Sequence, residues 1–106
     1  MAHRPRSGAR APDRKQQQTA AAELAIAALS FIAGEPERLG RFLALSGIGP
    51  DSIRAAAREP GFLLGVLDHV AGDEALLLAF ASQNEIDPET VARARSALAG
   101  AMPSEP

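Results

Sequence analysis

Residues 34–53 read GEPERLGRFLALSGIGPDSI, and residues 72–91 read GDEALLLAFASQNEIDPETV. When the first stretch is shifted by an offset of 38 in the numbering (72 − 34 = 38), the two align without a gap. Each contains Phe, five residues, Ile, one residue and Pro, beginning at Phe42 in the first stretch and at Phe80 in the second. Internal repeats set the fold class, so the pattern predicts a duplicated unit with this period. The alternative is two similar proline-initiated helices that share caps for physical reasons rather than by ancestry.

Helix signals fill both copies of the repeat. Ala and Leu, both strong helix formers, dominate the chain, and β-branched residues never form an alternating run. Pro36, Pro50 and Pro88 stand where the first turn of a helix accepts proline. We therefore expect an all-α, compact bundle of six short helices, built as two related three-helix units over residues 24–58 and 62–96.

The ends of two helices can be placed from single residues. Thr19 is expected to be the N-cap of the first helix, because a Thr hydroxyl accepts a hydrogen bond from the first turn. The third helix is expected to run from Pro50 to about Arg58, because Pro60 pushes the residue before it out of the helical region.

Charge divides the chain into a basic start and an acidic body. Residues 1–18 carry five basic side chains and one acidic one, and the rest of the chain carries six and twelve. The formal charge of −2 is thus the sum of +4 and −6. We expect a disordered basic tail at 1–18, a single helical domain at 19–100 and a disordered C-terminal tail at 101–106, because both ends lack the apolar surface that ordering requires.

Composition excludes several classes of protein. The chain of 106 residues is 46% hydrophobic, which is too apolar for a wholly disordered protein. Without cysteine it has no disulfide, thiolate metal site or cysteine nucleophile. The longest apolar run, residues 75–81, is far shorter than the ~20 residues of a membrane span, and no secretory signal follows the basic start. We expect a cytoplasmic protein that does not enter a membrane.

The two copies differ most in their second helices. Arg38 and Arg41 of the first copy are expected on the outer face of a surface helix, whereas Leu76 and Leu78 make the second copy apolar all round. That helix is either the central helix of the bundle, which we favour, or it presents Leu76 and Leu78 to a partner. The residues expected in the core are Leu29, Phe31, Leu39, Phe42, Ile48, Ile53, Phe62, Val66, Leu67, Leu77, Phe80, Ile86 and Val91.

His69 is the one residue that suggests catalysis. It follows Asp68 and precedes Asp73 by four residues, but a metal site needs three or four ligands at compatible spacing. In the repeat it takes the place of Phe31, which predicts a structural ring. No serine stands at a recognisable spacing from a histidine, and no phosphate-binding loop is present. We expect no catalytic residue, no cofactor and no metal, and hence not an enzyme.

Residues 43–58 are similar to a helix-turn-helix in the glycine of the turn and the apolar residues around it. Leu43 departs from the usual small residue, and Asp51 would face phosphates. The body also has too few basic groups to neutralise them, so DNA binding is the alternative function rather than the leading one. The residues that would serve it are Arg54, Arg58, Arg4, Arg6 and Arg10.

A resemblance to a known family rests on the run FIAGEPERLGRFLAL at 31–45, with support from residues 73–80 and 87–89. These runs resemble a family of short, uncharacterised bacterial helical proteins classed as a domain of unknown function, over residues of about 20–99. The resemblance implies an all-helical domain and a bacterial, cytoplasmic origin. It carries no activity to this chain.

The leading hypothesis is a small non-enzymatic protein–protein interaction module, with Leu76 and Leu78 as the candidate partner-binding residues. The partner is expected to be a protein of unknown identity, nucleic acid is the less favoured partner, and the chain is expected to be a monomer or a weak homodimer.

Overall fold

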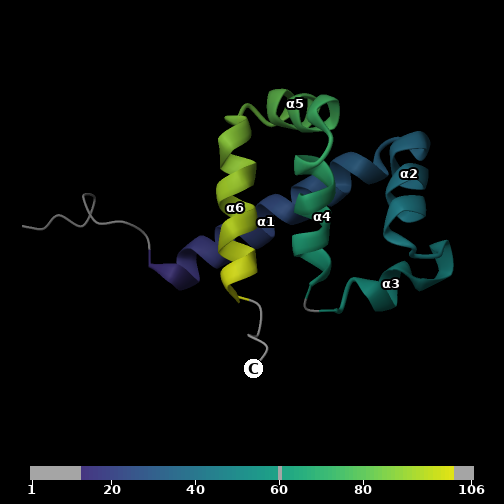
Figure 1. The fold of residues 1–106 in the computed structure, drawn as a ribbon, viewed down its shortest axis with the longest axis horizontal. Helices are drawn as coiled ribbons and strands as arrows, with labels where there is room; N and C mark the ends of the chain where they lie inside the picture. The colour runs from purple at the N-terminus through teal and green to yellow at the C-terminus, as the bar shows by residue number, and fades with distance from the viewer. Residues whose placement is uncertain (1–12, 60, 102–106) are drawn as a thin grey trace, which may run out of the picture.

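The computed structural model describes residues 13–59 and 61–101, and its regular elements are all helical (Figure 1). The elements, in chain order, are α1 (Arg14–Ala33), α2 (Pro36–Ser46), the 3₁₀ turn η2 (Pro50–Ser52), α3 (Ile53–Ala56), α4 (Phe62–Ala71), α5 (Glu74–Gln83) and α6 (Pro88–Ala101). The expected all-α bundle of six helices is therefore confirmed for the described residues. Among them, no helix combines the length and apolarity that crossing a membrane requires.

Helix α1 begins earlier than expected. Asp13 is its N-cap, and the Asp13 carboxylate accepts a hydrogen bond of 2.8 Å from the Gln16 backbone N–H. The expected cap at Thr19 is wrong, because Asp caps at least as well as Thr and the glutamines between them are good helix formers. Residues 14–18, expected in the disordered tail, are thus helical. Residues 1–12, with Arg4, Arg6 and Arg10, and residues 102–106 lie outside the described residues. Ala101, expected in the disordered C-terminal tail, is the last residue of α6.

Helix α1 is the central helix of the fold. It packs against α6, α4 and α2, and in Figure 1 it runs obliquely behind α4 and α6. Its buried stripe contains Ala21, Ala25 and Ala28, which follow one another at spacings of four and three. These small side chains let α4 and α6, which carry the fully buried Val66 and Val91, come close to α1. The core therefore lies along the seam of α1, α4 and α6.

The expectation that the helix of Leu76 and Leu78 is central is wrong. In α5 only Phe80 and Ala81 are buried, Leu76 is half-buried and Leu78 is 50% exposed. Figure 1 shows α5 at one end of α4 and α6, where it links the two helices. The central position expected for α5 belongs to α1, which packs against α6, α4 and α2.

The expected core is otherwise close to the observed one. Phe31, Phe42, Phe62, Val66, Leu67, Phe80 and Val91 are buried, and Leu29, Leu39, Ile48, Leu77 and Ile86 are partly buried and pack against them. Ile53 is the exception, because it lies on the four-residue α3 and does not join the core cluster. The cluster also contains residues that the core prediction omits, namely Ala21, Ala25, Ala28, Ile32, Val70 and Ala94.

Helix boundaries follow the same period as the sequence repeat. The last residues of α1 and α4 are offset by 38 in the numbering (71 − 33 = 38), and so are the first residues of α2 and α5 (74 − 36 = 38). After α2 and α5 the chain turns through a left-handed residue, Gly47 at φ 75° and Glu85 at φ 56°. The third helices differ, because α3 has 4 residues and α6 has 14. A common ancestry of the two units stays a prediction.

Candidate functional site

A cleft of about 270 Å³ lies between α2 and α5, beside α4. The starts of two helices contribute to it, since Glu35 is the N-cap of α2 and Asp73 the N-cap of α5. The Asp73 carboxylate accepts a hydrogen bond of 3.2 Å from the Leu76 backbone N–H, which fixes its position beside the cleft. The residues that line the cleft are Glu35, Glu37, Arg38, Arg41, His69, Asp73, Ala75, Leu76 and Ala79.

His69 enters the cleft from α4 and is half-buried. Its ring packs edge-to-face on Phe42, with ring centroids 5.1 Å apart and an interplanar angle of 78°. Burial lowers the pKa of His69 below its ordinary value, and the Arg41 guanidinium lowers it further, while the Asp73 carboxylate acts in the opposite direction. The imidazole is therefore held toward its neutral form.

The cations of the cleft are paired within it. An Arg41 guanidinium nitrogen lies 3.9 Å from an Asp73 carboxylate oxygen, and Arg38 Nε lies 3.8 Å from Glu35 Oε1. The Arg38 guanidinium also stacks over the Phe31 ring, with its Cζ atom 4.2 Å from the ring centroid. A cation over an aromatic face is attracted by the ring quadrupole. Arg41 is exposed, as expected for a surface helix, and Arg38 is half-buried. Both arginines also line the cleft.

The lining of the cleft is partly apolar and partly charged. Leu76, Ala75 and Ala79 contribute the apolar surface, while two guanidinium groups and three carboxylates contribute the charged surface. Glu37 is the lining carboxylate for which the described residues supply no ion-pair partner. Within the same residues, no group of three or more His, Asp or Glu side chains is placed to hold a metal ion. The arrangement is suited to packing and ion pairing with a bound side chain.

The structure separates the two leucines proposed as partner-binding residues. Leu76 lies in the cleft, whereas Leu78 is half exposed outside it. Residues two apart on a helix point to different faces, so the two leucines belong to different surfaces. Asp68, the sequence neighbour of His69, forms an ion pair with Arg95 of α6 and does not line the cleft.

The candidate DNA-binding residues lie elsewhere. Arg54 is exposed on α3, and Arg58 is exposed in the turn that follows it. The expected third helix does begin at Pro50, but as the 3₁₀ turn η2, and its α-helical part Ile53–Ala56 ends two residues before the expected end at Arg58. Figure 1 shows α3 below α2, at the opposite side of the view from α5, and the cleft lining contains neither Arg54 nor Arg58. Neither arginine therefore contributes to the cleft.

Sequence reasoning missed Arg38, Arg41 and Glu35 as site residues. The one available signal was their offset alignment with the second copy, in which Glu35 falls on Asp73. That match indicated two acidic helix starts, but it could not indicate that α2 and α5 face each other across His69.

The helices and the cleft together define a small all-α domain with a charged pocket. Residues 18–101 match a family described as "Protein of unknown function (DUF3572)". Because the match spans most of the chain, this protein belongs to that family, and the expected resemblance to a domain of unknown function is confirmed. No curated protein matches the chain, and no solved structure does.

Proposed function

We propose that this protein is a non-enzymatic protein–protein interaction module that receives a partner side chain in the cleft between α2 and α5. The observation that carries the proposal is the mixed lining of the cleft, in which half-buried Leu76 lies among three carboxylates and two guanidinium groups. Protein interfaces combine an apolar centre with a polar rim, and a few anchor residues supply most of the binding energy. The 270 Å³ cleft is smaller than a typical small-molecule site of ~300–1,000 Å³, and it suits a single anchor.

The charges of the lining favour a basic anchor. Three carboxylates stand against two guanidinium groups, and both guanidinium groups are already paired. A Lys or Arg of the partner would lay its apolar stem on Leu76 and pair its cationic head with Glu37. Long basic side chains commonly bury their stems in this way while the head stays in water.

Site-specific photo-crosslinking tests this function. A photoreactive amino acid replaces Ala75, which is exposed at the cleft, in the full chain expressed in its native cells. The same substitution at Ala57, exposed after α3, is the matched control. We expect one recurrent cross-linked protein from position 75 that is absent from position 57 and is lost when Glu37→Arg is added. Identical products from both positions, or none from position 75, would show the proposal to be wrong.

DNA binding is the second candidate function, and the turn after α2 favours it. Gly47 adopts φ 75°, a left-handed conformation that suits the turn of a helix-turn-helix, and Arg54 and Arg58 are exposed beyond it. The element that would enter the groove is short, because η2 and α3 have 3 and 4 residues. Duplex binding at about 50 mM salt that weakens in Arg54→Ala with Arg58→Ala supports this function, and the absence of binding at that salt excludes it.

A further inference from the structure

A second and larger hollow lies on another face of the molecule. It is a groove of about 1010 Å³ between the N-terminal half of α1 and the length of α6. Figure 1 shows α6 crossing α1 obliquely here. Its apolar surface comes from Leu24 of α1 and from small residues of α6 that include Ala97 and Gly100. Small residues leave room for another helix to approach closely, since packed helix axes lie ~8–10 Å apart.

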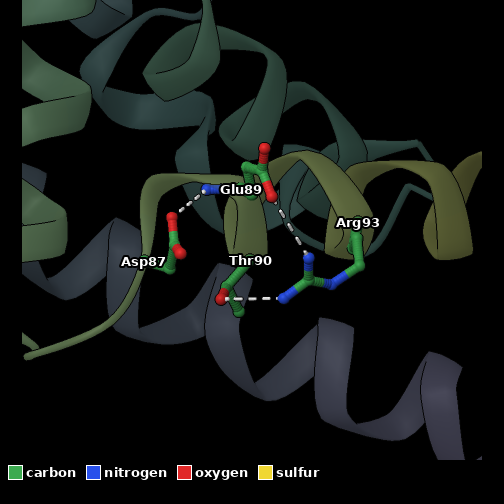
Figure 2. A network of polar contacts seen from close by, with 4 residues as sticks. All are labelled: Asp87, Glu89, Thr90 and Arg93. Atoms are coloured by element: carbon green, nitrogen blue, oxygen red, sulfur yellow. Dashed lines mark hydrogen bonds and ion pairs between the residues drawn. The ribbon is translucent and has the colours of Figure 1, made fainter.

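The charge of the groove is opposite to that of the body. Among the described residues, its lining contains two arginines, Arg14 and Arg93, and no Asp or Glu. Figure 2 shows how Arg93 is held: one guanidinium nitrogen donates to Thr90 Oγ1 at 3.3 Å, and another lies 3.8 Å from a Glu89 carboxylate oxygen. Arg14 makes no ion pair within residues 13–59 and 61–101. Outside residues 1–18 the chain carries twelve acidic side chains against six basic ones, so this groove is a basic site on an acidic domain.

We propose that this groove binds an acidic amphipathic helix of a partner protein. Amphipathic helices commonly dock their apolar face into a groove, and here Leu24, Ala97 and Gly100 would receive that face. Acidic residues on the flanks of the helix would pair with Arg14 and would compete with Glu89 for Arg93. A nucleic acid is a poorer fit, because the described lining holds two cations and no aromatic ring, whereas phosphate backbones require several basic groups. This surface is separate from the α2–α5 cleft, so the inference adds a second binding face to the proposed module.

The probe is a synthetic helical peptide of about 16 residues with Leu at i, i+3, i+4 and i+7 and Glu on both flanks. Its controls are the same peptide with Lys in place of Glu and a scrambled peptide of the same composition. Binding is followed by the backbone amide shifts of the ¹⁵N-labelled full chain. We expect saturable shifts that cluster at α1 and α6 for the acidic amphipathic peptide alone.

Charge variants of the protein then test the role of the two arginines. Arg14→Glu with Arg93→Glu is expected to weaken binding by about tenfold, which is within the contribution of two exposed ion pairs. The matched control is Arg54→Glu with Arg58→Glu, which makes the same charge change on and after α3 and is expected to leave binding unchanged. Ala92, exposed in the groove, provides a second pair: Ala92→Glu should weaken binding, and Ala92→Lys should not. Circular dichroism verifies that each variant is folded.

Four results would overturn the inference. The first is the absence of saturable shifts with the acidic peptide, and the second is equal binding of the basic or scrambled peptide. The third is equal weakening by the groove pair and by the control pair. The fourth is tighter binding at this groove of a DNA duplex than of the acidic peptide, which would assign the basic groove to nucleic acid.

Discussion

Glu85 occupies a backbone conformation that favours glycine. Its φ is 56°, and in the aligned repeat it takes the place of Gly47, whose φ is 75°. In both turns the following isoleucine N–H donates to a carbonyl five residues back, from Ile48 to Leu43 and from Ile86 to Ala81. This is the hydrogen bond of a Schellman motif, which ends a helix through a left-handed residue. The second copy thus keeps the turn without the residue that best allows it.

Glu85→Gly is therefore expected to raise the free energy of unfolding. The left-handed region costs a residue with a Cβ ~1–2 kcal/mol, and the greater freedom of glycine in the unfolded chain offsets part of that gain. We expect a net gain of up to about 1 kcal/mol in urea unfolding. Gly47→Ala is the converse variant. No atom lies within 4 Å of an added Cβ there, so a loss of about 1 kcal/mol would come from the backbone alone. Unchanged midpoints in both variants would contradict this account.

His69 links the stability of the domain to pH. Burial is the main cause of its lowered pKa, and Arg41 adds to it against Asp73. Because the unfolded chain then binds the proton more tightly than the folded one, this contribution to stability is complete above the unfolded pKa of about 6.5 and declines as the pH falls below it.

The variant His69→Phe removes this titration and places in α4 the ring that the first copy has at Phe31. Between about pH 7.5 and about pH 5.5, urea unfolding of the wild type is expected to shift to lower urea concentration more than that of the variant. Equal shifts of the two proteins over that range would exclude His69 as the cause. The range ends above the pKa of ordinary carboxyl groups, which limits their contribution.

Among the helices, a side-chain cap decides where α1 begins, and a proline in the sequence limits where α3 ends. Helix α1 starts at Asp13 rather than Thr19 because its first turn is capped by the Asp13 carboxylate. Helix α3 stops at Ala56, and Arg58 and Glu59 lie in the turn that follows. A residue that precedes proline disfavours the helical conformation, which accounts for the end of α3 before Glu59.

Asp13→Ala is expected to lower the free energy of unfolding by about 1 kcal/mol or to fray the first turn of α1, because it removes the N-cap acceptor. Thr19→Ala is the matched control. Thr19 is exposed inside α1, so Ala should be neutral or stabilise by a few tenths of a kcal/mol. Thermal unfolding followed by circular dichroism compares the two. A larger loss in Thr19→Ala than in Asp13→Ala would place the functional cap at Thr19.

Across the whole domain, two aromatic contacts relate the halves. Phe31 of α1 packs on Phe80 of α5 with centroids 5.6 Å apart, and His69 of α4 packs on Phe42 of α2 at 5.1 Å. In the aligned repeat, Phe31 corresponds to His69 (31 + 38 = 69), and Phe42 corresponds to Phe80 (42 + 38 = 80). Each unit thus places its ring against the other unit, as in a two-fold interface. This exchange supports the predicted repeat.

The buried alanine stripe of α1 predicts which substitutions lower the stability of the fold. Ala25 of α1 is fully buried, whereas Ala33, the last residue of α1, is exposed. Ala25→Leu is expected to lower the free energy of unfolding by ~1–3 kcal/mol through overpacking, and Ala33→Leu by less than ~0.5 kcal/mol. Chemical denaturation measures both. Equal effects would mean that α1 does not form the tight seam of the bundle.

Local signals in the chain were enough to specify the helical class, most of the helix breaks and most of the large core residues, because proline, glycine and apolar spacing act over a few residues. Phe42 and Phe80 are predicted in the core for that reason, and both are buried there. The same signals marked acidic starts at Glu35 and Asp73, but not their shared cleft. Only the tertiary structure shows that α1 is central and that α5 is peripheral. Alanine is both a helix former and a close-packing residue, so its burial depends on which helix crosses it, and that is settled by packing between distant segments.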